Sequence, residues 1–333
     1  MNRQHFLARV AMAGIAVALA VSSSLANAQA KKIKVQLPWL YNAVFAGEIV
    51  ALKKGFFAEK GLDVELLPGG PSTNPIQEAL SGVAQISVGY APEIMYAANQ
   101  GLPIKSFAAT FQRAPLTFYS LGEANIRSIR DWKGKRIGAS QASIPQIKAV
   151  LHLKGMKFDD IKFVQAQVPA LLQGQVDAVG SWPTNVAVNA PIVSRPGGYN
   201  TQSVWDNGLQ FQSNYYMAPD RTIRNDSETL VRFLEAADKG WAYAADYPED
   251  AINLVVSVSS ALNKDQELAS LKIITRDFIY TDATRESGFG TVSKERWNAT
   301  VKSYADIGEI KRGLSADDVF DDRILKGARR TRR

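Results

Sequence analysis

The chain has 333 residues, 46% of them hydrophobic, and a formal net charge of +7. Much of the positive charge lies at the two ends of the chain, on Arg3, Arg9, Arg329, Arg330, Arg332 and Arg333. The body between them is near neutral, so the net charge does not indicate a nucleic-acid surface, and we expect no nucleic-acid partner. No cysteine is present, which excludes disulfides and a lipid-modified cysteine.

Residues 1–28 have the features of a cleavable export signal. Arg3 and Arg9 lie near the start, residues 10–21 are apolar, and Ala26-Asn27-Ala28 has the small-x-small form that signal peptidase recognises. The apolar stretch is too short for a membrane span, which needs about twenty residues. An uncleaved amphipathic helix is the alternative, but charge order, length and cut site favour cleavage near Ala28. We expect the mature protein to begin near Gln29, outside the cytoplasm.

The first part of the mature chain alternates strands and helices. Strands are predicted at residues 33–37, 62–67 and 85–90, with amphipathic helices between them. This order is typical of a parallel-sheet α/β lobe, in which small molecules bind beyond the C-terminal ends of the strands. The sequence therefore predicts a site formed by the loops at residues 38–46, 69–74 and 90–93.

The alternation continues and then gives way to helices. Further strands are predicted at residues 105–111, 116–121, 136–139, 161–164 and 176–179, with helices at 93–100, 145–154 and 168–174. From Asp226 onward the pattern is mostly helical, with segments at residues 227–243, 248–257, 264–275 and 294–307, and another beginning at 316.

About 300 mature residues are enough for two medium-sized cores, so we expect two α/β lobes. The first lobe would be discontinuous, with residues 29–117 and 214–325, and the second would be residues 118–213 inserted into it. Two crossing strands, at residues 113–119 and 211–217, would connect the lobes and run antiparallel or side by side. The basic tail, residues 326–333, is expected to be a solvated, frayed end.

Polar residues precede several predicted helices that begin with proline. Ser72, Thr73 and Asn74 lead into Pro75, and Gln141 and Ser143 precede another such helix. The prolines fit sharply starting helices without any ligand, whereas the hydroxyls and amides also suit an anion or a carbonyl oxygen. These loops lack the spacing of a nucleotide fingerprint and a Walker lysine, which excludes phosphate-nucleotide binding.

Aromatic residues recur at the same predicted edge: Trp39, Tyr41, Tyr90, Trp182, Tyr215 and Tyr216. One such residue is more typical of a core or rim position, but together they favour a site that stacks a planar ring. Asn42 lies in the first of these loops, and Glu93 follows Tyr90 as an acceptor for a ring N–H. Glu48 is a second candidate acceptor.

Catalytic machinery is hard to assemble from this sequence. His152 is the only histidine of the mature chain and lies within a predicted helix. Without cysteine, a metal-ligand cluster or a Gly-x-Ser-x-Gly elbow, nucleophilic and zinc chemistry have no support. We expect a binding protein rather than an enzyme, with no catalytic residue, cofactor or metal. Asp177 is expected to fix a turn, and Arg113 to pair with an acidic neighbour of the other lobe.

Five segments resemble one family, the periplasmic solute-binding proteins for nitrate, sulfonates, taurine and thiamine-precursor pyrimidines. They are residues 54–64, Gly69-Gly70-Pro71, and residues 80–89, 129–138 and 174–178. The resemblance implies a two-lobe periplasmic binding protein fold (type II, Venus flytrap) with the ligand in the cleft. It also implies a periplasmic monomer that delivers its ligand to an inner-membrane ABC permease.

Within this family, Trp39, Phe45-Ala46-Gly47 and Gly69-Gly70-Pro71 look most similar to the branch that takes heteroaromatic ligands, such as pyrimidines or riboflavin. A sulfonate, taurine or nitrate binder of the same family is the main alternative. A pyrimidine-processing enzyme is a weaker one, because the cysteine-rich motif and active histidine of that branch are missing here.

Overall fold

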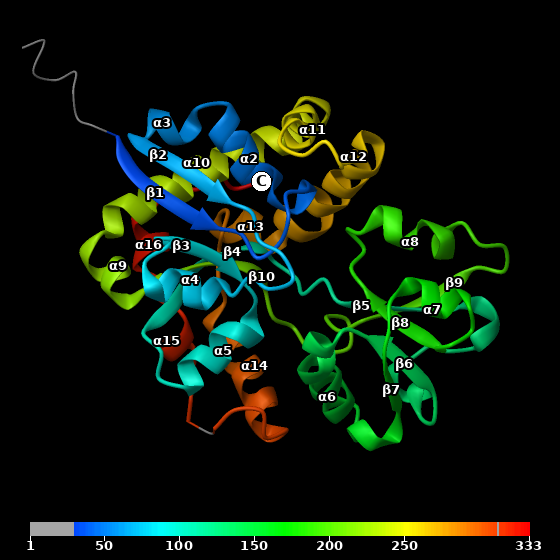
Figure 1. The fold of residues 1–333 in the computed structure, drawn as a ribbon. Helices are drawn as coiled ribbons and strands as arrows, with labels where there is room; N and C mark the ends of the chain where they lie inside the picture. The colour runs from blue at the N-terminus through cyan, green and yellow to red at the C-terminus, as the bar shows by residue number, and fades with distance from the viewer. Residues whose placement is uncertain (1–29, 312) are drawn as a thin grey trace, which may run out of the picture.

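A computed structural model describes residues 30–311 and 313–333; the expected export signal lies outside these residues. Two five-stranded mixed sheets, each with its own helices, form the two lobes (Figure 1). The first sheet has the order β2 (Leu62–Leu67), β1 (Lys31–Gln36), β3 (Ile86–Gly89), β10 (Ser213–Pro219), β4 (Ile104–Phe111). The second has the order β7 (Lys162–Gln165), β6 (Arg136–Ala139), β8 (Ala178–Ser181), β5 (Thr117–Leu121), β9 (Tyr199–Ser203). The predicted two-lobe α/β fold is confirmed.

The helices of the first lobe come from both ends of the chain. They are α2 (Ala46–Lys53), α3 (Phe56–Glu59), α4 (Pro75–Ser81), α5 (Ala91–Asn99), α9 (Asp220–Asn225), α10 (Ser227–Asp246), α11 (Pro248–Ser257), α12 (Lys264–Ile273), α13 (Asp282–Ser287), α14 (Lys294–Asp306), α15 (Ala316–Val319) and α16 (Arg323–Gly327). The second lobe has α6 (Ile144–Leu153), α7 (Val168–Leu172) and α8 (Val186–Val193). None of the helices in the described ranges combines the length and hydropathy that crossing a bilayer requires.

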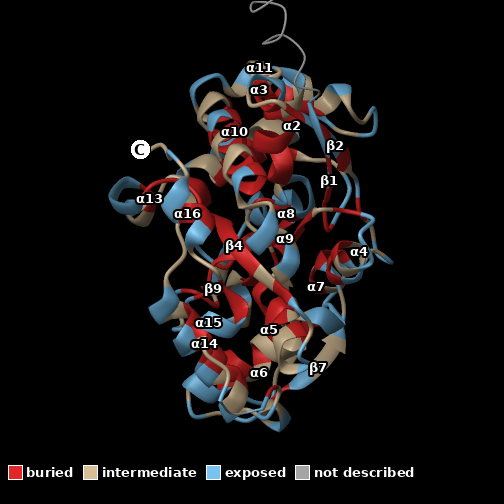
Figure 2. Ribbon diagram, turned by 90° about the vertical axis from the view of Figure 1, so that its left-hand side faces the viewer, coloured by how far each residue is buried: buried red, intermediate tan, exposed pale blue. Residues whose placement is uncertain are grey.

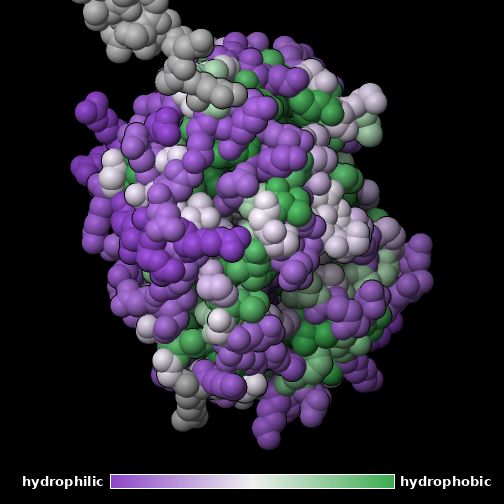
Figure 3. Space-filling model, turned by 60° about the vertical axis from the view of Figure 1, so that its left-hand side comes forward, coloured by the Kyte–Doolittle hydropathy of each residue, from purple (hydrophilic) through white to green (hydrophobic). Residues whose placement is uncertain are grey.

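The core of the first lobe lies between its sheet and the long helix α10. Buried residues line β4 and the facing sides of α2 and α10 (Figure 2). The two helices approach closely at Gly47 and Gly240, where a methyl group on Gly47 would lie 2.2 Å from the ring of Trp241. Hydrophilic side chains cover most of the face shown in Figure 3, and hydrophobic side chains appear there only in separate patches.

Glu48 lies inside this core and not in a binding loop. Its carboxylate accepts a hydrogen bond from the hydroxyl of Tyr216, and both residues are almost fully buried. Burial raises the pKa of Glu48 to about 7. The expectation that Glu48 accepts a ligand N–H is therefore wrong, because α2 turns this residue toward α10 and β10.

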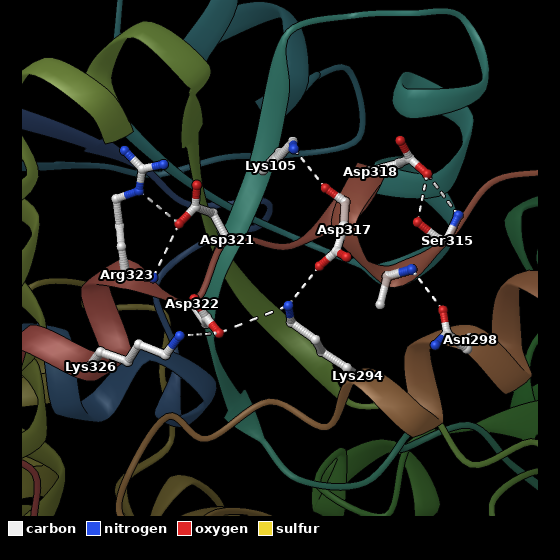
Figure 4. A network of polar contacts seen from close by, with 11 residues as sticks. Lys105, Lys294, Asn298, Ser315, Asp317, Asp318, Asp321, Asp322, Arg323 and Lys326 are labelled. Carbon is white, nitrogen blue, oxygen red and sulfur yellow. Dashed lines mark hydrogen bonds and ion pairs between the residues drawn. The ribbon is translucent and has the colours of Figure 1, made fainter.

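The C-terminal segment covers the edge of β4. Phe320 forms a parallel bridge with Ser106, and the N–H of Asp321 donates to the carbonyl of Ser106 at 2.9 Å. An ion-pair network attaches the same segment to α14 and β4 (Figure 4). In it, Lys294 Nζ lies 2.6 Å from a carboxylate oxygen of Asp317. These pairs are exposed, so they contribute little free energy and mainly fix the position of the segment.

The basic tail is not frayed, in contrast to the sequence-based expectation. The N–H of Arg329 donates to Glu235, that of Thr331 donates to Asp238, and the guanidinium of Arg333 donates to the carbonyl of Ala242. All three acceptors lie on α10. The tail thus docks on the first lobe, because α10 offers a row of acceptors that the sequence pattern does not reveal.

In the second lobe, the sequence predicted the strands β6 and β7 and the helix α6 to within a residue or two, but missed α8 and β9. Helix α8 contains Pro191, and β9 (Tyr199–Ser203) is an edge strand of mainly polar residues. Neither segment has a clear apolar period, so neither could be recognised from the pattern alone.

The two crossings do not pair as strands with each other. β5 pairs with β8 and β9, whereas β10 pairs with β3 and β4. Their contact is made by side chains: Gln212 Nε2 donates to Gln112 Oε1 at 2.6 Å, and each residue is 1% exposed. We propose that the lobe boundaries lie near residues 117 and 213, because the strands on either side of these points belong to different sheets.

A second contact between the lobes lies away from the crossings. Lys148 Nζ on α6 lies 2.7 Å from Glu309 Oε1, which follows α14 in the first lobe. The hydroxyl of Tyr96 on α5 donates to the other oxygen of Glu309 at 3.0 Å. This three-residue contact, the interlobe clamp, joins the lobes only while they are close together.

We predict that Glu48 makes folding stability depend on pH. A carboxyl whose pKa is raised in the folded state, here from 4.5 to about 7, binds its proton more tightly folded than unfolded. The free energy of unfolding should therefore rise as pH falls from 7 toward 4.5, by up to about 3 kcal/mol from this residue. Urea unfolding of Glu48→Gln at several pH values should show a flatter profile than the wild type. Glu228→Gln, on the exposed side of α10, is the control; a profile unchanged by Glu48→Gln would refute the assignment.

The interlobe clamp should shift the balance between closed and separated lobes. A partly exposed ion pair contributes roughly 0.5–1 kcal/mol, so Lys148→Met should favour separated lobes about two- to fivefold. Small-angle scattering should then give a larger radius of gyration for this variant than for the wild type. Lys154→Met, just past the end of α6, is the matched control and should behave like the wild type. Equal radii for all three proteins would show that the clamp does not hold the lobes.

Candidate ligand-binding cleft

Loops at the C-terminal ends of strands from both lobes meet in one cleft. Tyr90 follows β3 of the first lobe, and Trp182 follows β8 of the second. Their rings make an edge-to-face contact, with centroids 5.6 Å apart and an interplanar angle of 88°. This contact places aromatic residues of both lobes against each other at the centre of the cleft.

Two cavities share Tyr90 and Trp182 as walls. The first, which we call the aromatic cavity, has a volume of about 190 Å³ and is also lined by Trp39, Asn42 and Phe45. The second, the central cavity, has a volume of about 360 Å³ and is also lined by Glu93, Gln141 and Ser143. A planar ligand in either cavity would contact the aromatic pair.

A third cavity adjoins the central one along α5. This side cavity has a volume of about 350 Å³ and shares Glu93 and Tyr96 with the central cavity. Its other walls include Thr73, Asn74 and Gln100. Asn74 also caps α4, because its side-chain oxygen accepts the N–H of Gln77 at 3.1 Å.

Glu93 is the acidic side chain that lines these cavities. One of its oxygens accepts the N–H of Tyr90 at 3.1 Å, an N-terminal cap of α5. Burial raises the pKa of Glu93, and the same desolvation raises that of the Tyr90 phenol. Of the residues that the structure describes, no lysine or arginine lines any of the three cavities. Among the described residues, the cleft therefore offers aromatic faces, amides and hydroxyls, and a half-buried carboxyl, without a compensating cation.

Three of the residues predicted for the site lie elsewhere. The hydroxyl of Tyr41 donates a hydrogen bond to the carbonyl of Leu66 at 2.6 Å, and the residue packs against the hydrophobic core of the first lobe. Tyr215 is 1% exposed, with its ring centroid 4.9 Å from that of Trp297. Ser72 is exposed and lines none of the three cavities. β10 lies inside the sheet, so Tyr215 faces the core although it is close to a crossing.

Other residues line the cleft that sequence reasoning did not select. Asn185 borders the aromatic cavity, and Tyr96 borders the central and side cavities. Asn185 follows a strand in the run Ser181-Trp182-Pro183-Thr184-Asn185, a position comparable to that of Asn74, so the pattern contained a usable signal. Tyr96 lies one helical turn after Glu93 and could have been selected on that spacing.

The side chains considered for chemistry have structural surroundings. His152 is exposed on α6. Asp177 accepts the N–H of Arg136 at 2.7 Å and pairs with its guanidinium, which lowers the pKa of the carboxyl; it therefore joins the starts of β6 and β8 and does not fix a local turn as expected. Arg113 lies over the ring of Trp205, 5.9 Å from its centroid, and makes no ion pair with a described residue. Across residues 30–311 and 313–333, no three His, Asp or Glu side chains are grouped to hold a metal ion.

A larger cavity, of about 620 Å³, lies on another side of the second lobe. Its walls are formed by the strands β5 and β9, by α8, and by the helical turn Ile274–Ile279 of the first lobe. Most of this lining is apolar, with Val193 and Tyr199 exposed at its edge. Pro183 follows β8, and Ser203 and Trp205 lie at and just after the end of β9, so part of this wall also lies at the C-terminal ends of strands. We propose that the ligand binds between Tyr90 and Trp182, because the loops after β3 and β8 bring the two lobes together there.

The fold is similar to that of solved periplasmic binding proteins. The aliphatic sulphonate binding protein SsuA from Escherichia coli superposes with a TM-score of 0.69 over 86% of this chain and 91% of that chain, at 13% identity. A Candida albicans protein described as having the generic periplasmic binding protein fold gives a TM-score of 0.61 over 89% of this chain and 94% of that one, at 15% identity. At such identities these likenesses show the fold alone.

Sequence comparison gives the family. A formylaminopyrimidine-binding protein from Halalkalibacterium halodurans is 25% identical over 86% of this chain and 89% of its own length. The riboflavin-binding protein RibY from Chloroflexus aurantiacus is 21% identical over 89% of this chain and 87% of its own length. Pyrimidine phosphate synthases also match, at 19 to 29% identity. Residues 42–251 match the family described as NMT1/THI5 like, and the chain belongs to that family.

Proposed function

We propose that this protein captures a small planar heteroaromatic solute in the periplasm and delivers it to an inner-membrane ABC permease. A thiamine-precursor pyrimidine or a riboflavin-like molecule is the expected solute. The relatives named as binding proteins for a formylaminopyrimidine and for riboflavin support this assignment.

The composition of the cleft is the observation that carries the proposal. Trp39, Tyr90 and Trp182 present aromatic faces, and Glu93 presents a half-buried carboxyl where none of the described residues lining the walls is basic. An ionised carboxyl repels a sulfonate or nitrate, and a carboxyl oxygen accepts a hydrogen bond from a ring N–H or an amino group. Each aromatic stack would add about 0.5–1.5 kcal/mol beyond burial.

Closure of the two lobes would complete the site. Trp182, Gln141 and Ser143 belong to the second lobe, whereas Tyr90 and Glu93 belong to the first. A solute between them would join both lobes and favour the closed form, in which the interlobe clamp is made. The permease would then recognise this closed form of a monomer.

Conversion of the solute is a weaker alternative, although pyrimidine phosphate synthases are among the relatives. Among the described residues, no histidine, lysine or arginine lines the cavities of the cleft, and the chain has no cysteine. General acid–base chemistry would have to rely on Glu93 and tyrosines, and the serine and threonine hydroxyls of the walls have no histidine or lysine beside them to act as a base. This supports capture without conversion.

The proposal predicts that a planar heterocycle quenches tryptophan fluorescence and raises the melting temperature. Binding only to the native state adds about 2.7 kcal/mol at a hundredfold excess over Kd. Trp182→Ala should weaken binding of 4-amino-5-hydroxymethyl-2-methylpyrimidine or riboflavin about tenfold, through loss of a stack and of buried area. Thermal melts and fluorescence titrations would measure both effects.

Val193→Trp is the control for this experiment. It fills part of the larger cavity and leaves the cleft unchanged, so affinity should stay as in the wild type. Binding of taurine or nitrate that weakens with added salt, ignores Trp182→Ala and has no heterocyclic competitor would reject the proposal in favour of an anion-binding protein.

A further inference from the structure

One face of α5 forms a wall of both the central cavity and the side cavity. Glu93 and Tyr96 border both cavities, Tyr90 borders only the central cavity of these two, and Gln100 borders only the side cavity. These residues are three or four positions apart, the spacing that places side chains on one helical face. At 1.5 Å per residue, the segment from Tyr90 to Gln100 extends about 15 Å. The two cavities are neighbours along this face, so an elongated molecule that passes over the side chains of Glu93 and Tyr96 would reach from one to the other.

The chemistry of the walls changes along this face. At one end, Tyr90 and Trp182 offer flat aromatic surfaces. At the other end, the walls carry the hydroxyl of Thr73 and the amide of Gln100. Neither of these side chains makes a hydrogen bond to another described residue, so both can bind a ligand. An aromatic ring fits the first end, and a hydroxylated chain fits the second.

Glu93 lies where the two ends join. One oxygen of Glu93 accepts a hydrogen bond from the N–H of Tyr90, whereas the neighbouring hydroxyl of Tyr96 donates its hydrogen bond to Glu309. The carboxyl of Glu93 can thus accept a hydrogen bond from a donor near the junction of ring and chain. It is the acidic residue among the lining residues of both cavities.

We infer that the cleft takes a two-part solute: a planar heterocycle against Tyr90 and Trp182, and a flexible hydroxyl-bearing chain that passes Glu93 and ends between Thr73 and Gln100. This inference rests on the proposed function. It narrows the proposed ligands to heterocycles that carry a flexible chain. A compact ring would leave the side cavity to water and would make no contact with Gln100.

A matched pair of ligands tests the inference. Riboflavin carries a hydroxylated chain, and lumichrome has a closely similar fused ring system without that chain. Riboflavin should bind the wild type at least about fivefold more tightly, because each added hydrogen bond contributes a factor of roughly two to ten. Gln100→Ala should remove much of this advantage and leave lumichrome unchanged. Gln77→Ala, on the exposed side of α4, is the control and should alter neither affinity.

The outcomes separate this inference from the proposed function. Equal affinity of riboflavin and lumichrome for the wild type, or an equal effect of Gln100→Ala on both, would overturn the two-part solute and leave heterocycle binding standing. The same holds if 4-amino-5-hydroxymethyl-2-methylpyrimidine binds more tightly than riboflavin. Failure of all three compounds to bind, in fluorescence titration and calorimetry, would overturn both.

Discussion

The arrangement of this protein depends on a buried hydrogen bond between two glutamines at the crossings. Gln212 donates to Gln112 at 2.6 Å and also to the carbonyl of Thr291, while Gln112 donates to the carbonyls of Ala109 and Thr291. Buried amides without these partners would each cost about 1–3 kcal/mol, so these hydrogen bonds keep the two crossings next to each other. That geometry brings the C-terminal ends of the strands of one sheet toward those of the other. The cleft, with Tyr90 and Trp182 in contact, is the consequence.

The ligand preference that we propose for the cleft depends on which side chains its walls lack as well as on those they contain. An anion needs donors or a cation, and an ionised carboxyl works against it; Glu93 supplies a half-buried carboxyl with no basic partner among the described residues. Aromatic faces are of little use to a compact inorganic anion but contribute strongly to binding a ring. A fold shared with a sulphonate binding protein therefore does not imply the same ligand. The side chains at the strand ends decide the chemistry.

Local sequence was a good guide where the pattern is strong. The strand Leu62–Leu67 alternates buried and exposed residues, and its bounds agree with the prediction, as do those of Arg136–Ala139 and Pro248–Ser257. Asn74 and Pro75 mark the start of a helix by capping and by a fixed backbone angle. The sequence pattern did not predict α8 and β9, because α8 contains an internal proline and β9 is polar. Both elements depend on neighbours that are distant in sequence.

The sequence by itself determined that the chain forms two α/β lobes and that the loops after the strands supply Trp39, Asn42, Tyr90, Glu93 and Trp182. Hydrophobic periodicity and turn residues involve positions that are close together in the chain, so they can be recognised from the sequence alone. Only the tertiary structure decided which of these side chains share a cavity. In the folded chain, Tyr215 and Glu48 face the core, the hydroxyl of Tyr41 donates to a backbone carbonyl, and the basic tail packs on α10. Direction and burial depend on long-range packing, because a residue next to a loop faces the ligand or the core according to what lies against it.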